Sequence, residues 1–388
     1  MKEYKLSQLL EIKNGKDHKE LPDGEYPVFG SGGVMRFVNE YLYDKPSILL
    51  PRKGSLDNIQ YCDVPFWTVD TLYYTVVNEE LANPYFLYRY LKLLDLSRLD
   101  SGTGVPSMTF DSYYGIKVLL PEIEEQKRIA SVLQKLDTKI KLNCQINDNL
   151  EAMAKLLYDY WFVQFDFPNE EGKPYKSSGG AMVWNEKLKR EIPQGWSGVS
   201  LKDLALTSRN AITPVENEVY QHFSIPSFDA CGSYSLDNGS DIKSDKFVLQ
   251  KGQLLVSKLN PWFNRVVWVP KGTNMIGSTE FVVLNPNNES ESGYIYSVIK
   301  SPKFIAYCSQ AATGTSHSQR RVSPDVLMAF KAVYEQGVVQ KYGCLIEKIQ
   351  KQQAELLSEI AILTKQRDEL LPLLMNGQAT VNYHLSDD

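Results

Sequence analysis

Apolar residues recur every three or four positions in a segment that starts about a third of the way along the chain. This spacing places side chains along one side of a helix and is typical of a coiled-coil seam. The pattern predicts a helix of about 40 residues, roughly 60 Å long, from Glu122 to Phe162. Lys139 and Asn143 interrupt the apolar series, which consists of Ile129, Val132, Leu136, Ile146, Leu150, Met153, Leu157 and Tyr160.

The same three-four pattern returns about 213 residues later and predicts a second long helix from Glu335 to Met375. Its positions are Leu345, Ile349, Gln352, Leu356, Glu359, Leu363, Gln366, Leu370 and Leu373. A buried helix of an ordinary bundle would carry a similar stripe. Two such helices at one offset, each after a similar globular segment, favour an antiparallel pair within the chain.

The segments that precede the two helices also resemble each other. A Tyr-rich helical stretch leads to "SGTG" at 101–104 and to "AATG" at 311–314, and a short apolar run follows each. Strand-like runs come before the helical stretch in both halves, which favours an α+β class over a doubly wound sheet. We expect two similar mixed domains (1–121 and 196–334), two helices (122–165 and 335–378), a Gly- and Pro-rich linker read as loop (166–195) and a tail (379–388).

Composition narrows the function classes. The 388 residues are 43% hydrophobic and 11% aromatic, which is enough to fill real cores. The charged start and the lack of a long apolar run predict a cytoplasmic protein with no membrane partner. Five scattered cysteines and four separate histidines predict neither disulfides nor a metal site. A net charge of −5 means that any nucleic-acid contact must come from local patches or from a basic partner.

Motifs for catalysis are incomplete. "NPYF" (Asn83–Phe86) and "NPWF" (Asn260–Phe263) come close to the Asn-Pro-Pro-aromatic motif of adenine methyltransferases but lack its second proline. "FGSGG" has the wrong glycine spacing for the methyl-donor site, no nucleotide-binding GxxxxGK[ST] motif occurs, and "EQK" at Glu125–Lys127 falls on the long helix. His317 has no visible triad partners. We therefore expect no catalytic site, no metal and no cofactor bound by this chain.

Polar loops are better candidates for binding. "PRKGS" at 51–55 and "FGSGGVMRF" at 29–37 place basic residues at Gly turns, and "SKLNPWFNR" and "TGTSHSQRRVS" do so in the second half. Arg and Lys neutralise phosphates, Arg pairs with guanine, and Asn or Gln pairs with adenine. For any one such loop, a solvated surface is the commoner explanation. Matching loops in both halves favour DNA.

Longer stretches of the chain resemble a known family. "LPEIEEQKRIASVLQKLDTKIKLNCQINDNLEAMAKLLYDYWFVQFDFP", "IPQGWSGVSLKDLA", "SGTGVPSMT" and "TKQRDELLPLLMNGQ" are similar to the specificity subunits of type I restriction–modification systems. "YPVFGSGGVMRFVNEYLYDKPSILLPRKGSLDNIQYCDVPFWTVDTLYY" looks like one of their target-recognition domains. The resemblance covers nearly the whole chain.

The resemblance implies a non-catalytic subunit with two target-recognition domains in pseudo-twofold arrangement, each reading half of a split site in double-stranded DNA. Two conserved helices act as a spacer, and two methylation subunits that carry S-adenosylmethionine dock on them. Restriction subunits that use ATP and Mg²⁺ can join. On the helices, the docking candidates are Ile129, Leu136, Leu150, Leu157, Ile349, Leu356, Leu363 and Leu370.

The DNA-binding candidates come from both domains. They are Arg36, Arg52, Lys53, Thr103 and Ser107 in the first, and Lys258, Arg265, Ser316, Gln319 and Arg320 in the second. The second loop is longer by about four residues, and the "PRKG" turn has no clean counterpart in the second half, so we expect different half-sites. Two alternatives stay open: a coiled-coil scaffold that binds only proteins, and a fused methyltransferase, against which the incomplete motifs argue.

Overall fold

The computed structural model describes residues 1–54, 56–96, 106–314 and 319–381. The chain divides into two compact units, and each contains one end of both long helices. Unit 1 comprises Met1–Leu142 and Ile360–Asp388, and unit 2 comprises Asn143–Glu359. Each unit is described by itself.

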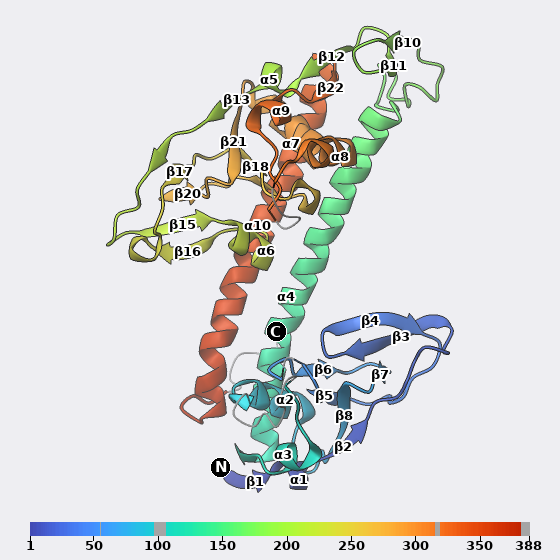
Figure 1. Cartoon of the computed structure of the whole chain (residues 1–388). Coiled ribbons are helices and arrows are strands. Elements are labelled where there is room, and N and C mark those ends of the chain that lie inside the picture. Colours follow the sequence, from blue (N-terminus) through green and yellow to red (C-terminus); the bar gives the residue numbers. More distant parts are fainter. Residues whose placement is uncertain (55, 97–105, 315–318, 382–388) are drawn as a thin grey trace, which may run out of the picture. The chain divides into compact units, whose positions relative to one another are not determined.

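Unit 1 is a mixed domain built on three small sheets (Figure 1). The central sheet has the antiparallel order β2-β8-β5-β6, beside a β4-β3-β7 sheet and a β1-β9 pair. The elements are β1 (Lys2–Lys5), α1 (Leu6–Leu9), β2 (Leu10–Asn14), β3 (Asp23–Gly30), β4 (Gly33–Val38), β5 (Ser47–Pro51), β6 (Gln60–Cys62), β7 (Trp67–Thr68), β8 (Leu72–Val77), α2 (Pro84–Lys92), α3 (Phe110–Tyr114), β9 (Lys117–Leu120) and α4 (Ile123–Tyr158).

Unit 2 repeats this plan and enlarges it. Its central sheet has the order β13-β21-β18-β19, the second sheet has five strands, and β12 pairs with β22 as β1 pairs with β9. The elements are η2 (Asp159–Val163), β10 (Met182–Asn185), β11 (Arg190–Pro193), β12 (Ser197–Ser200), α5 (Leu201–Leu204), β13 (Ala205–Ser208), β14 (Ala211–Ile212), β15 (Val219–Phe223), α6 (Ile225–Cys231), β16 (Ser235–Asn238), η3 (Gly239–Asp241), β17 (Lys246–Val248), β18 (Leu254–Ser257), η4 (Pro261–Phe263), β19 (Val266–Trp268), β20 (Met275–Gly277), β21 (Phe281–Pro286), η5 (Glu289–Glu291), α7 (Ser292–Lys300), α8 (Pro302–Ala311), α9 (Pro324–Met328), β22 (Lys331–Tyr334) and α10 (Gln336–Met375).

The two central sheets have equivalent strands in equivalent order, which confirms the prediction of two similar α+β domains. The segment read as loop differs from expectation, since it contains the β10–β11 hairpin. There the Phe167 ring stacks on Tyr175 with centroids 4.8 Å apart and lies 4.9 Å from the ring of Trp196. Aromatic packing orders a segment that its Gly, Pro and Ser content marks as irregular.

The two long helices pack against each other in both units, as the pattern predicts. In unit 1, Ile129 and Leu133 of α4 share a buried cluster with Leu371 and Leu374 of α10. In unit 2, the Tyr342 hydroxyl donates to the Ala154 carbonyl at 3.4 Å. The partners on α10 fall as the numbers on α4 rise, so the helices are antiparallel within each unit.

Polar residues of the two helices also contact each other in unit 2, and Asn143 and Glu359 are positions that interrupt the two apolar series. The fully buried Asn143 donates from Nδ2 to Oε2 of Glu359 at 2.8 Å. Gln353 is also buried and donates to the Asn147 carbonyl at 3.4 Å. A buried polar pair tolerates few alternative partners, so these contacts favour one register of the helices.

In each domain, a cation that also contacts a tyrosine pairs with a carboxylate of α4. In unit 1, Arg89 and Tyr85 of α2 both contact Asp137, whose other oxygen accepts from Nη1 of Arg367 on α10 at 3.1 Å. In unit 2, Lys300 of α7 pairs with Glu151 and donates to the Tyr296 hydroxyl at 3.0 Å. Each domain is thereby anchored to the helix pair by charge as well as by apolar packing.

Unit 2 also depends on a close approach of backbones. A Cβ on Gly343 of α10 would lie 2.0 Å from the Ser290 carbonyl oxygen, and a Cβ on Gly293 would lie 2.6 Å from the Gly343 carbonyl oxygen. Neither backbone oxygen can rotate away as a side chain could. Glycine is therefore required where α7 meets α10.

We predict that Gly343→Ala lowers the free energy of unfolding by about 2–3 kcal/mol, because overpacking against backbone exceeds the gain in helix propensity. Gly337→Ala in the same helix is the matched control, since its Cβ would lie 3.4 Å or more from its nearest neighbour, the Glu335 carboxylate. Chemical denaturation of both variants measures the difference. Equal stability of the two variants would contradict the required approach.

Candidate nucleic-acid interface

The turn after β5 is held from two sides in unit 1. The Arg52 amide donates to the Thr71 carbonyl at 2.9 Å, and the Met108 amide donates to the Arg52 carbonyl at 3.1 Å. Gly54, at φ +94°, donates to the Pro106 carbonyl at 3.0 Å. This ladder sets Lys53 opposite Ser107. Three of the predicted residues, Arg52, Lys53 and Ser107, are thus brought together.

The other two predicted residues of unit 1 are not part of this arrangement. Arg36 lies on β4, where Nη2 pairs with the Asp23 carboxylate at 2.6 Å and donates to the Leu21 carbonyl at 2.9 Å. Its guanidinium is thus engaged within its own hairpin. Thr103 lies outside the described residues.

A polar hollow of about 500 Å³ lies beside the turn, and sequence reasoning did not identify it. Burial lowers the pKa of the Lys92 ammonium, the neighbouring Arg89 charge lowers it further, and Asp57 opposes them. Lys92 ends a helix in the sequence, so no local signal connected it with the turns. The hollow is lined by Ser31, Gly32, Gly54, Asp57, Asn58 and Lys92.

Unit 2 contains an equivalent turn after β18. The Lys258 amide donates to the Glu280 carbonyl at 2.8 Å, and the Val322 amide donates to the Lys258 carbonyl at 3.0 Å. These bonds match the two made by Arg52. The expectation that the "PRKG" turn has no clean counterpart is therefore wrong, because the turn at Lys258 makes equivalent backbone bonds. Sequence comparison did not reveal this counterpart, because the intervening loops differ in length.

Predicted residues also gather at this second turn. The Asn260 amide donates to the Arg320 carbonyl at 2.7 Å, and the Arg320 amide donates to Oδ1 of Asn260 at 3.1 Å. Lys258 and Arg320 are half-buried, and Gln319 beside them is exposed. Ser316, and His317 next to it, lie outside the described residues.

Arg265 is more deeply buried than the other predicted cations. Its Nε and Nη2 atoms reach the two carboxylate oxygens of Asp229 at 2.6 and 2.8 Å, and the guanidinium stacks over the Phe263 ring at 4.5 Å. The side chain is buried. The hydrogen bonds from Arg265 hold the pKa of the Asp229 carboxyl below its usual value. Within the structure, Arg265 supports the turn.

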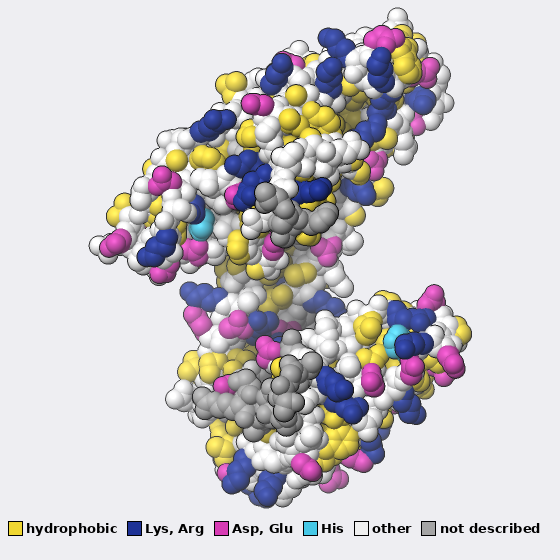
Figure 2. Space-filling model, in the orientation of Figure 1, with side chains coloured by type: hydrophobic (Ala, Val, Ile, Leu, Met, Phe, Trp, Pro, Cys, Tyr) yellow, Lys and Arg dark blue, Asp and Glu magenta, His cyan; other side chains and the backbone are white. Residues whose placement is uncertain are grey.

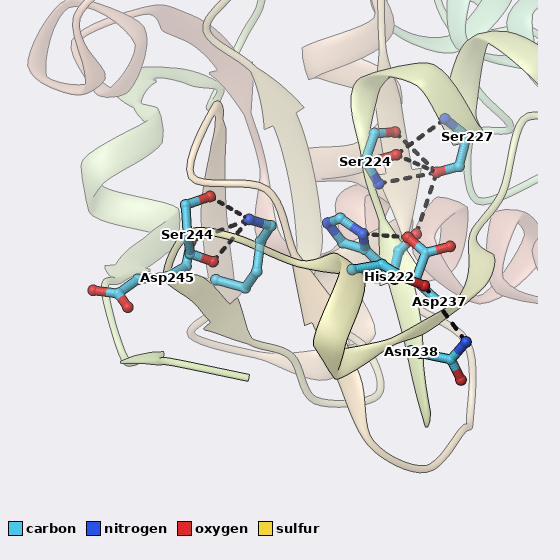
Figure 3. Close-up of polar contacts among 9 residues, drawn as sticks. His222, Ser224, Ser227, Asp237, Asn238, Ser244 and Asp245 are labelled. Carbon is cyan, nitrogen blue, oxygen red and sulfur yellow. Dashed lines mark hydrogen bonds and ion pairs between the residues drawn. The ribbon is translucent and has the colours of Figure 1, made fainter. Parts of the chain in front are cut away.

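A second polar cluster lies on the five-stranded sheet of unit 2 (Figure 3). Nδ1 of His222 on β15 is 2.7 Å from Oδ2 of Asp237 on β16, and Ser227 of α6 donates to the His222 carbonyl at 3.2 Å. His222 Nε2 is buried without a hydrogen-bond partner in the described part of the chain. These three residues lie within 15 positions of one another, but sequence reasoning did not identify the cluster.

The predicted docking residues differ in exposure. Ile129, Leu150 and Ile349 are buried in the cores of their own units and present little surface to a partner. Leu136, Leu157, Leu356 and Leu363 are half-buried, and Leu370 is exposed. Other apolar helix residues are more accessible, and in unit 2 four of them follow each other at three-four spacing: Met153, Leu156, Tyr160 and Val163.

Metal binding, disulfide formation and membrane spanning each require particular side chains or helices. Among the described residues, no group of three His, Cys, Asp or Glu side chains could hold a metal ion. All five cysteines lie within those residues and are free thiols. No helix in the described ranges is both long and apolar enough to cross a membrane.

Comparisons with known proteins agree with this geometry. Residues 1–152 match the family model described as the type I restriction modification DNA specificity domain. The MjaIX specificity subunit of Methanocaldococcus jannaschii is 22% identical over 360 residues, which are 88% of this chain and 79% of that protein. The first 152 residues thus match a type I restriction DNA specificity domain, and the chain as a whole is similar to type I restriction specificity subunits.

Two further relatives extend the comparison. The HindI specificity subunit of Haemophilus influenzae is 36% identical over 114 residues, 27% of this chain and 24% of its own. The crystal structure of a type I S subunit from M. genitalium has the same fold, with a TM-score of 0.64 and 17% identity over 96% of this chain and 95% of that one.

The ion pair beneath the second turn makes the stability of the chain pH-dependent. The Asp229 pKa is lowered on folding, so the pair stabilises the fold above the ordinary aspartate pKa of about 3.9 and loses this effect as pH falls below it. We predict that Asp229→Asn has a lower melting temperature than wild type at pH 7, and that the difference narrows below about pH 4.

Melting curves between pH 3 and pH 7 test this prediction. Asp148→Asn on the exposed side of α4 is the control, and its melting temperature should follow that of wild type throughout. A difference for Asp229→Asn that stays constant over this range would show that the Arg265 pair does not contribute through its charge.

Proposed function

We propose that this chain is a specificity subunit that reads a two-part site in double-stranded DNA, with one half-site read by each domain (1–121 and 196–334). The observation that supports this best is the repeated turn, which presents Arg52 and Lys53 in unit 1 and Lys258 in unit 2 through equivalent backbone bonds. Turns with equivalent backbone bonds and different side chains suit two different half-sites.

The residues at the turns have separate roles in this proposal. Lys53, Lys258 and Arg320 neutralise phosphates and orient the domains, because their contacts carry little sequence information. Gln319 is suited to adenine and Arg52 to guanine, since each can form two hydrogen bonds to the base edge. Arg36 can join them by exchanging its Asp23 partner for phosphate.

The paired helices (122–165 and 335–378) separate the half-sites and dock two methylation subunits, which bring S-adenosylmethionine. Restriction subunits with ATP and Mg²⁺ can join the same assembly. Because the chain has a net charge of −5, these partners supply part of the positive charge that binds DNA. The three-four stripe of Met153, Leu156, Tyr160 and Val163 is the most accessible apolar helix surface for docking.

The methylated motif of the source genome tests the function. We predict a split motif with a fixed gap, readable by modification-sensitive sequencing.

A seven-residue insertion in both helices, after Leu142 and after Glu359, keeps each unit and the seam phase intact. It adds about 10 Å, so the gap should grow by about three base pairs. A continuous motif, or an unchanged gap, contradicts the spacer role.

The docking surface gives a separate prediction. Leu156→Glu combined with Tyr160→Glu should weaken binding of a methylation subunit by at least about 30-fold, because two exposed apolar contacts become charged. Leu206→Glu is the control, since Leu206 is as exposed as Leu156 but lies on β13. Titration calorimetry measures both variants. Wild-type affinity in the double variant would place the docking surface elsewhere.

A further inference from the structure

The two Asn-Pro-aromatic-Phe sequences differ in the burial of their aromatic rings. In unit 1, Asn83 caps α2 by accepting from the Phe86 amide at 3.0 Å, and Tyr85 and Phe86 are buried. In unit 2, the same pattern forms η4 at the second turn, with 40% of Trp262 and 57% of Phe263 exposed. The first copy is a helix start within the core. The second displays two large aromatic rings to solvent.

The backbone that carries these rings is in an uncommon conformation. Asn260 has φ 48° and Asn264 has φ 51°, so left-handed residues bracket η4 on both sides. Asparagine tolerates this region better than most residues but still at some energetic cost. The Phe263 amide donates to the Asn260 carbonyl at 3.1 Å, and the Asn264 amide donates to the Pro261 carbonyl at 3.1 Å. The turn is closed and compact.

Neighbouring elements fix this turn. Asn260 is bonded twice to the Arg320 backbone, and Asn264 Nδ2 donates to the Lys300 carbonyl at 3.4 Å. The Arg265 guanidinium, held by Asp229, stacks over Phe263. A loop that is only a linker needs neither this support nor exposed aromatic rings. Rigid, exposed aromatic side chains are typical of surfaces that bind a partner.

Charge and position indicate which partner. Lys258 precedes the aromatic pair in the same turn, and Arg320 and Gln319 lie across its backbone bonds. Figure 2 shows Lys and Arg side chains beside apolar ones on the visible face of unit 2. The equivalent turn in unit 1 carries Arg52, Lys53 and Gly54 and no aromatic residue. Any effect of the rings is therefore confined to the second domain.

We propose that Trp262 and Phe263 form an apolar wedge that the second domain inserts between neighbouring base pairs of its half-site. The inference rests on the proposed DNA-reading function and adds a readout by deformation. Apolar side chains that enter a base step unstack it and kink the duplex, and flexible pyrimidine–purine steps kink most easily. The second domain would then favour such a step without a hydrogen bond to its bases.

The test uses the full chain assembled with its methylation subunits and a duplex that carries the methylated motif. Energy transfer between dyes at the duplex ends measures the bend. Wild type should bend the DNA by about 20° or more. Trp262→Ala with Phe263→Ala should remove most of this bend and weaken specific binding about 10- to 100-fold, with little effect on a duplex that lacks the motif.

Two further variants make the comparison specific. Trp184→Ala removes a Trp that is 58% exposed on β10 and should change neither the bend nor the affinity. Trp262→Phe with Phe263→Trp keeps two aromatic rings and should keep the bend. Loss of bending in this swapped variant would mean that support of the turn, and not insertion, determines the bend, and would overturn the wedge.

The remaining outcomes separate the wedge from the proposed function. Specific binding without a bend, or an equal bend in the double alanine variant, overturns the wedge and leaves the DNA-reading role intact. Failure of the wild-type assembly to distinguish the motif from other DNA contradicts the proposed function itself. Loss of methylation subunits from the double alanine variant would assign the rings to a protein contact, which also overturns the wedge.

Discussion

The pairing of α4 with α10 is the constraint on which the rest of the structure depends. Neither helix can bury its own apolar side, and isolated helices gain little stability in water. In each unit, one helix end provides a surface for the other and for the domain beside them. The Asp137 and Glu151 carboxylates then connect α2 and α7 to this surface through buried or half-buried cations. A substitution in the interface between α4 and α10 would therefore change how the domain of that unit packs against the helices.

Polar residues of α4 and α10 also select one register of the helix pair. Asn143 and Glu359 occupy positions where each apolar series is interrupted, and they bond to each other. Apolar side chains would pack in several registers at similar energy, whereas a buried amide needs its partner. Part of the stability of the seam is thus exchanged for a defined register, which the proposed spacer role requires.

The repeated domain separates scaffold from recognition. Backbone hydrogen bonds at Arg52 and at Lys258 are equivalent, so the turn is supported in the same way in both domains. The side chains, the loop lengths and the second sheet differ. Strand order depends on backbone pairing and burial, which many sequences satisfy, whereas contacts to a ligand depend on the few exposed side chains at the turns. In the proposed function, duplication with divergence at the turns gives one fold two specificities.

Elements that depend on periodic burial follow from the amino-acid sequence alone: the two long helices, their antiparallel pairing and the two similar α+β domains. The sequence also identified basic residues near turns, and Arg52, Lys53, Ser107, Lys258 and Arg320 do lie at such turns. The partner of each charged side chain and the exposure of each aromatic ring are visible only in the folded chain. Arg265 pairs with Asp229, and Arg36 pairs with Asp23. Lys92 lines a hollow together with residues that lie far from it in the sequence. The aromatic residues of "NPYF" are buried, whereas those of "NPWF" are exposed. The physical reason is that burial periodicity is local, whereas the partner of a charge or an aromatic ring comes from any part of the chain.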